Sequence, residues 1–125
     1  MEQRILVSVK KVLNVAESDT SFDLDITMHI NSALARLKQL GIGPPTGFMI
    51  EDAEATWDAF VGDDPRWNQV RTYVYMSVRL VWDPPTSPVA LNSMEKQIDK
   101  LEWLLNVEHE EATWQPPVVV SEPSW

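Results

Sequence analysis

The sequence predicts an all-α protein, a small bundle of four to five helices with a long antiparallel helix hairpin and an extended C-terminal arm. Two observations predict this fold class. Apolar residues recur every three or four positions along most of the chain, which is the period of an amphipathic helix. Between these stretches lie glycine, proline and capping residues that end one helix and start the next. With 125 residues, 44% of them hydrophobic, the chain is expected to form one core.

The first two helices are predicted over residues 5–16 and 23–40. In the first, the β-branched stretch ILVSV is also compatible with a short strand, although we favour the helix. The second has one apolar stripe with steps of three and four residues: Ile26, Ile30, Ala33, Leu37 and Leu40. Gly41 suits a left-handed position after its last turn, and Ile42 is expected to fold back onto that turn.

A short third helix is predicted across residues 53–61, with Gly62 ending it. Asp64 as N-cap and Pro65 as first helical residue are a strong start signal for a fourth helix. The two apolar stripes of this helix are Trp67, Val70, Val74 and Val81, and Tyr73, Met76 and Leu80. A helix that is apolar over most of its circumference is typically central to its bundle or shared with a neighbouring chain.

The stretch RLVWDPPTSP marks a turn between the fourth and fifth helices. The fourth helix is expected to end at Asp83, because Pro84 and Pro85 cannot continue the hydrogen-bond ladder. Ser87 and Pro88 then serve as cap and first turn of the fifth helix. The apolar seam of this helix has heptad spacing: Leu91, Met94, Ile98, Leu101 and Leu105. Seam and short turn together predict an antiparallel hairpin.

The charge and composition of the chain argue against several classes of protein. Its net charge is −9, from 19 acidic and 10 basic residues, whereas proteins that bind nucleic acid or anionic lipid present basic surfaces. There is no cysteine for a disulfide, a thiolate nucleophile or a zinc site. No apolar run approaches the ~20 residues of a membrane helix, and the first residues do not resemble a signal peptide. We therefore expect no membrane partner and a location in the cytoplasm.

The sequence contains no group of residues that specifies an active site, so we expect neither an enzyme nor a cofactor or metal site. His29 and His109, the only histidines, are expected to be surface or packing residues. The acids around His109 indicate a solvated helix end, because adjacent helical side chains diverge. The motif GIGPPTG lacks the Lys-Ser/Thr of a phosphate loop. Arg71, Tyr75 and Arg79 share a helix face, and ion pairs with a neighbouring helix are expected there rather than phosphate contacts.

The helical period is lost after the fifth helix, which divides the chain into a helical domain (residues 1–110) and an extended C-terminal arm (residues 111–125). Prolines prevent a helix in the arm, and three consecutive valines favour a strand for which the chain offers no partner. We predict that the arm is mobile in the free subunit, orders on assembly and adds a strand to a partner's sheet edge. Its predicted partner-binding residues are Trp114, Pro116, Pro117, Val118, Val119, Val120 and Trp125.

Four segments, in order along residues 22–107, resemble the head–tail connector (adaptor) proteins of tailed bacteriophages: DITMHINSALARLKQLGIGP, GFMIEDAEATWDAF, RTYVYMSVRLVWDPP and SMEKQIDKLEWLLNV. The most distinctive pieces are HINSAL before LGIG, and DPP followed by KQIDKLEWLLN. None of these motifs is catalytic, and the resemblance depends on their order and spacing. The residues beyond Glu111 lie outside it.

The resemblance implies a structural virion protein at the head–tail junction, assembled in the host cytoplasm. It implies a homo-oligomeric ring, expected to be twelve-fold, that lies under the portal protein and extends the DNA channel. Such a ring serves genome packaging and ejection, and docks the next connector or tail protein. Genomic DNA would pass through it without sequence-specific binding. The arm would then add its strand to the portal protein or to the adjacent subunit.

A ring of such subunits would be strongly negative, and acids on its bore would repel the phosphates of passing DNA. The candidate channel-facing acids are Asp52, Glu54, Asp58, Asp63 and Asp64. The competing interpretation is a small acidic regulatory binding module that masks a basic partner protein. A regulator of this kind shares the charge and the lack of catalytic groups, but is expected to be a monomer or dimer.

Overall fold

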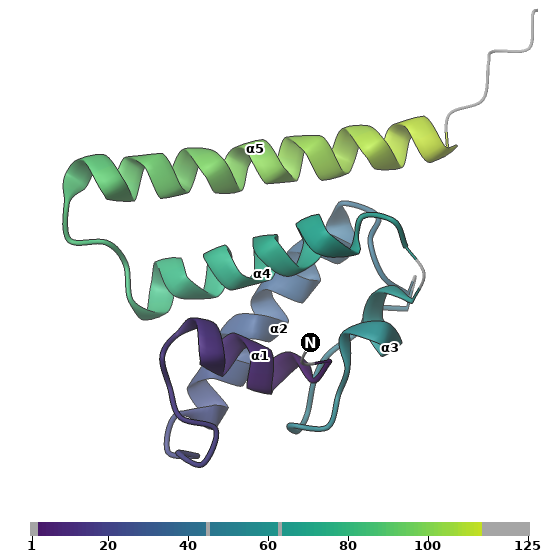
Figure 1. Ribbon diagram of the computed structural model, residues 1–125. Coiled ribbons are helices and arrows are strands. Elements are labelled where there is room, and N and C mark those ends of the chain that lie inside the picture. Colours follow the sequence, from purple (N-terminus) through teal and green to yellow (C-terminus); the bar gives the residue numbers. More distant parts are fainter. Residues whose placement is uncertain (1–2, 45, 63, 114–125) are drawn as a thin grey trace, which may run out of the picture.

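The computed structural model describes residues 3–44, 46–62 and 64–113, with side chains described up to residue 106 (Figure 1). The described residues form five helices and no strand: α1 (Ile5–Val12), α2 (Asp23–Gln39), α3 (Trp57–Val61), α4 (Trp67–Trp82) and α5 (Pro88–Thr113). The prediction of an all-α fold is confirmed. The first segment is a helix, so the alternative of a short strand there is wrong.

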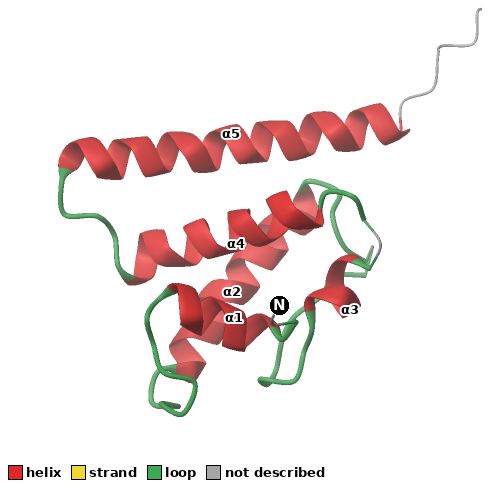
Figure 2. Ribbon diagram, in the orientation of Figure 1, coloured by secondary structure: helices red, strands yellow, loops and turns green. Residues whose placement is uncertain are grey.

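The helices are arranged in layers around α4. α2 packs on one side of α4 and α5 on another, while α1 packs against both α2 and α4. Figure 2 shows α5 running back along α4 after a short turn, as the outermost helix of the described chain. The predicted antiparallel hairpin is therefore present, and α4 has the central position that its apolar circumference indicated.

The core lies where these helices meet. Every residue of the predicted α2 stripe is buried. α4 adds the residues of its middle turns: Val70, Tyr73, Val74 and Val78. From α5, Ile98 and Leu105 are buried, and the other seam residues, Leu91, Met94 and Leu101, are half-buried. The heptad seam thus faces α4, but only Ile98 and Leu105 of its five residues are buried.

The predicted apolar stripe of α4 is wrong at its two ends. Val81 is 58% exposed and Trp67 is also exposed, whereas Val78, which was not in the stripe, is buried. In the last turn of α4 it is Trp82 that faces α2, because its ring meets Phe22 edge-on at a centroid distance of 5.2 Å. The helical period correctly places Val81 on the side of α4 that faces the core, but the core does not extend to the last turn of the helix.

The first helix ends at Val12, not at residue 16 as predicted. Asn14 takes a left-handed conformation with φ of 65°, and the amide of Val15 donates to the carbonyl of Lys10 at 2.9 Å. This is the hydrogen bond of a Schellman ending, with asparagine in the place that glycine usually fills. The apolar period continues past it, which is why the sequence pattern placed the end too late.

Two other helix boundaries agree with the prediction. After α2, Gly41 has φ of 84°, and the amide of Ile42 donates to the carbonyl of Leu37 at 2.9 Å, while Ile42 itself is buried. At the start of α5, the amide of Leu91 donates to the carbonyl of Ser87 at 2.9 Å. Both boundaries are set by local residues, so they could be found in the sequence.

The starts of α3 and α4 lie later than predicted. α3 begins at Trp57, because the amide of Ile5 donates to the carbonyl of Ala55 at 2.9 Å and thereby holds the preceding residues in an extended course. α4 begins at Trp67. Asp64 caps the turn before it, accepting from the backbone amide of Arg66 at 2.8 Å. Asp64 and Pro65 therefore precede the helix instead of forming its N-cap and first residue.

Candidate interaction surface

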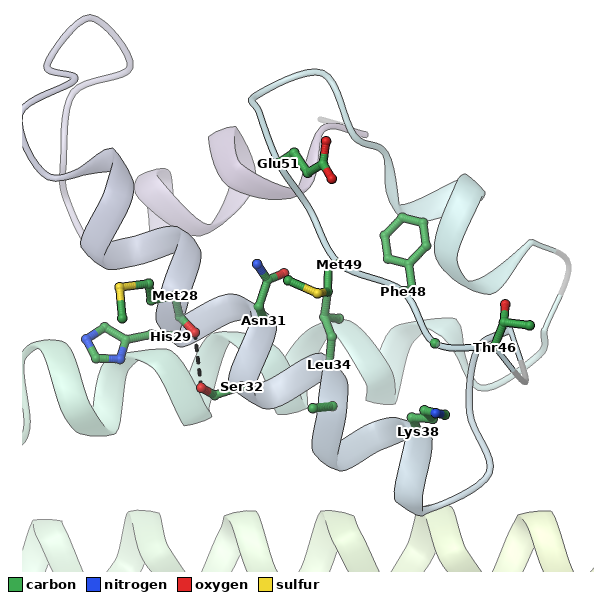
Figure 3. A pocket seen from close by; sticks show the side chains of 12 residues that line it. Met28, His29, Asn31, Ser32, Leu34, Lys38, Thr46, Phe48, Met49 and Glu51 are labelled. Carbon is green, nitrogen blue, oxygen red and sulfur yellow. Dashed lines mark hydrogen bonds between the residues drawn. The ribbon is translucent and has the colours of Figure 1, made fainter.

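An open groove lies between α2 and the segment 46–51. Figure 3 shows Met28, Asn31 and Lys38 along α2, with Met49 facing them from the segment. The ring of Phe48 points away from α2 and meets that of Phe60 on α3 at a centroid distance of 5.2 Å. The groove has a volume of about 950 Å³ and a lining that is mostly apolar.

One side chain fastens the segment to α2. The Nδ2 of Asn31 donates to the carbonyl of Ile50 at 3.0 Å, and the backbone amide of Ile50 donates to the Oδ1 of Asn31 at 2.8 Å. The backbone N–H and C=O of Ile50, which is buried, are therefore both hydrogen-bonded to the side-chain amide of Asn31. Just before the segment, the backbone at Gly43 lies close against Phe60, since an added Cβ would lie 2.5 Å from its ring. The groove therefore has a fixed wall.

The rim of the groove exposes large apolar side chains. Met28 is 60% exposed and Met49 is 69% exposed. Methionine side chains adapt to the shape of a partner, and clustered exposed apolar groups mark interaction sites. Glu51 and Lys38 are charged residues of the lining, and Figure 3 places them at different ends of the labelled set. The groove is suited to an apolar contact with charged surroundings.

A polar network joins three helices. The hydroxyl of Tyr73 on α4 donates to the Oε2 of Glu102 on α5 at 2.6 Å. The guanidinium of Arg36 on α2 donates to the Oε1 of the same carboxylate at 2.9 Å. Glu102 thus accepts from α2 and α4 at once, which fixes how the outer helix lies on the other two.

The network changes the titration of its members. Partial burial would by itself raise the pKa of Glu102, but the hydrogen bonds from Arg36 and Tyr73 and the positive charge of Arg36 lower it below its usual value. Burial, together with the bond to Glu102, raises the pKa of Tyr73 well above the usual value for a phenol. At neutral pH the carboxylate is therefore an acceptor and the phenol a donor.

Arg71 has aromatic neighbours that the sequence did not predict. Its guanidinium lies 5.4 Å from the ring centroid of Trp57 and 5.5 Å from that of Trp67, and its Nη2 donates to the hydroxyl of Tyr75 at 2.9 Å. The side chain is buried. Cation–π contacts of this kind stabilise the junction of α3 with α4, and they leave Arg71 unsuited to contact a phosphate in solution.

The candidate channel-facing acids have different surroundings. Asp52, Glu54 and Asp58 are exposed to solvent. Asp64 forms an ion pair with Arg66 at 2.7 Å, and the hydrogen bond from this guanidinium lowers the pKa of the Asp64 carboxyl. Asp63 lies outside the described residues. Three acids therefore remain with freely exposed charge on the segment before α3 and on α3 itself.

The partner-binding residues of the arm, from Trp114 to Trp125, lie outside the described residues, as does the side chain of His109. α5 continues to Thr113, beyond the boundary drawn after residue 110. His29 lines the groove and its ring meets that of Trp82 at a centroid distance of 6.5 Å.

Two further kinds of feature are absent from the described part of the chain. Over that part of the chain, histidines and acids do not gather into a group that could bind a metal ion. None of the described helices combines the length and hydropathy needed to cross a membrane.

The groove itself was not predicted from the sequence. Its signal is weak: Met28 lies off the buried stripe of α2, and Met49 precedes the buried Ile50 in a segment without helical period. Only the folded chain brings these residues together.

A family model described as "Phage connector protein" matches residues 5–112. This span begins at the first residue of α1 and ends one residue before the last residue of α5. No curated protein and no solved structure matches the chain.

Proposed function

Since the chain belongs to the phage connector protein family, we propose that it is the subunit of a homo-oligomeric ring beneath the portal protein. Membership of the family gives the chain a structural role as a head–tail connector in the virion and no enzymatic role. The ring, its position under the portal and its contact with the next connector or tail protein are the proposed part. The main support for this proposal is the match of the family model to residues 5–112.

Several features of the subunit support assembly into a ring. A cyclic ring needs two different surfaces on each subunit that meet head to tail. The helices are layered around α4, so that α2 and α5 offer separate outer surfaces. The groove beside α2 exposes methionines at its rim. A regulator that acts as a monomer would leave these apolar side chains in water.

The bore of the ring is proposed to be negative, so that genomic DNA passes without sequence-specific binding. Of the five acids predicted for this surface, Asp52, Glu54 and Asp58 are exposed. Asp64 is a weaker candidate, because Arg66 balances its charge. Repulsion of phosphates by such acids discourages DNA from sticking to the wall.

Neutralising the acids tests this part. The variant Asp52→Asn/Glu54→Gln/Asp58→Asn should fold with an unchanged melting temperature, because none of these side chains is buried. We expect slower genome packaging or ejection in phage that carry it. Asp64→Asn is the matched control and should affect stability rather than DNA passage. Normal infectivity of the triple variant would count against a negative bore at these residues.

Electron microscopy of the chain mixed with its cognate portal protein tests the ring. We expect closed rings attached to one end of the portal. The competing function, an acidic regulator that masks a basic protein, predicts a monomer or dimer that leaves the portal bare. The net charge of −9 supports the regulator, but it is equally compatible with a ring subunit.

A further inference from the structure

Two exposed surfaces lie on different sides of α4. The first is the groove between α2 and the segment 46–51. The second is the side of α5 that is turned away from α4, which we call the outer α5 face and define as Val89, Lys96, Lys100 and Trp103. Val89, Lys96 and Trp103 recur every seven residues, so they lie in one row along the helix. Figure 1 shows no described element covering this side of α5.

The outer α5 face combines apolar and basic side chains. Val89 is 80% exposed and Trp103 is 63% exposed. Lys96 and Lys100 are exposed between them, and the acids of the same stretch are Glu95, Asp99 and Glu102. Tryptophan is the residue most typical of binding hot spots, and here it lies in water. On a chain with a net charge of −9, Lys96 and Lys100 give this face two positive charges beside the tryptophan, with Asp99 between them.

The groove has complementary features. Met28 and Met49 form an apolar rim, and the volume of about 950 Å³ has room for an indole ring. Thioether sulfurs make favourable contacts with aromatic rings. Glu51 lines the groove, and Asp25, one turn before Met28 on α2, is exposed. The groove therefore offers methionines for a tryptophan. Glu51 in its lining and Asp25 on the preceding turn of α2 offer carboxylates for lysines, and Lys38 adds one positive charge to the lining.

We infer that the outer α5 face of one subunit packs into the groove of the next subunit, with Trp103 entering between Met28 and Met49. This inference rests on the proposed ring. The two surfaces are different and belong to helices on different sides of α4, so their contact is heterologous and can be repeated from subunit to subunit. Lys96 and Lys100 meet the carboxylates of Asp25 and Glu51 at the rim, where opposite charges fix the register of the contact.

Disulfide cross-linking tests the contact directly, because the chain contains no native cysteine. In the variant Met49→Cys/Trp103→Cys, mild oxidation of rings bound to the cognate portal should give a ladder of covalent oligomers up to the full ring. Each single-cysteine variant should give dimers at most. The matched control is Val12→Cys/Trp103→Cys, whose first cysteine is exposed on α1 and should give no ladder.

The outcomes separate this inference from the proposed function. If rings form on portals but the test pair gives no ladder, the inferred contact is wrong and the proposed ring is still supported. If no ring forms even for the wild-type chain, the proposed function fails and the contact fails with it. A ladder in the test pair alone supports both.

Charge reversal gives a second, independent readout. Lys96→Glu/Lys100→Glu should weaken ring formation about tenfold or more, and so should Asp25→Lys/Glu51→Lys. The chain that carries all four substitutions should assemble again, since the charges are exchanged across the contact. All three variants are checked by circular dichroism for the helical content of the wild type. If the chain with all four substitutions folds but stays monomeric, the proposed register is contradicted.

Discussion

At the scale of single residues, Glu102 joins three helices through one carboxylate. Its two oxygens accept from Tyr73 and Arg36, and these bonds lower its pKa when the chain folds. A group whose pKa is lowered in the folded state stabilises that state fully above its unfolded pKa, about 4.3. This stability is lost as the pH falls through the lower, folded pKa.

The variant Glu102→Gln should therefore be less stable than the wild type at pH 7, by about 1 kcal/mol. Arg36 is largely exposed, so solvent screens its share, and most of the loss is assigned to the bond from Tyr73. Urea unfolding at pH 7 and at a series of pH values below 4.5 gives the measurement. The difference between the two proteins should shrink toward acid pH. A difference that stays constant would mean that the carboxylate charge contributes nothing.

A second residue-scale prediction concerns the hairpin seam. Leu105 is completely buried, so Leu105→Ala removes packed methyl groups and leaves a cavity. We expect a loss of about 2–5 kcal/mol in the free energy of unfolding. Leu91→Ala is the control, because Leu91 is half-buried and should cost clearly less. Equal losses in the two variants would show that burial in the seam is even along α5.

At the scale of elements, the sequence allowed some boundaries to be predicted and not others. The end of α2 depends on Gly41 and Ile42, which are adjacent in the sequence. The start of α3 depends on a hydrogen bond from Ile5, some fifty residues earlier, which no local pattern contains. The exposure of Val81 also could not be found in a local pattern. The helical period shows which side of the helix faces the core, but not how far the core extends along the helix. The groove needs contacts between α2 and a segment without period.

Asn31 is the side chain on which the groove wall depends. Asn31→Ala removes both bonds to Ile50 and leaves two buried backbone groups without these partners. We expect a loss of about 1–3 kcal/mol and faster hydrogen exchange of the Ile50 amide. Ser32→Ala is the matched control, because its exposed hydroxyl bonds only to the carbonyl of Met28 in its own helix. Unchanged exchange at Ile50 would show that the bonds to Asn31 do not hold the segment in place.

At the scale of the whole molecule, the layered arrangement explains how a small acidic chain can be an assembly subunit. α4 is covered by α2 and α5 within one subunit, so the hydrophobic core does not require a neighbour. The surfaces left over are the groove and the outer α5 face, on helices that lie on different sides of α4. A folded subunit can therefore exist before assembly, and the proposed ring would form from surfaces that the core does not use.

The predicted arm belongs to the same scale, since its role is defined only in the assembly. Truncation after Thr113 keeps α5 whole and removes Trp114, the three valines and Trp125. The truncated chain should keep its helical content and its melting temperature, because every described core residue lies before the cut. Its attachment to portals should fail, since the proposed strand and its tryptophan anchors are gone.

Co-sedimentation of the truncated chain with portal rings measures that attachment. The control Pro116→Ala/Pro117→Ala keeps the valines and tryptophans and changes only the preference for an extended backbone, so it should bind portals more weakly than the full chain but measurably. The proposed ring contact between the groove and the outer α5 face lies within residues 25–103, so truncated subunits should still show the disulfide ladder at high concentration. Attachment of the truncated chain as tight as that of the full chain would mean that the helical domain alone docks on the portal, and the arm proposal would then be wrong.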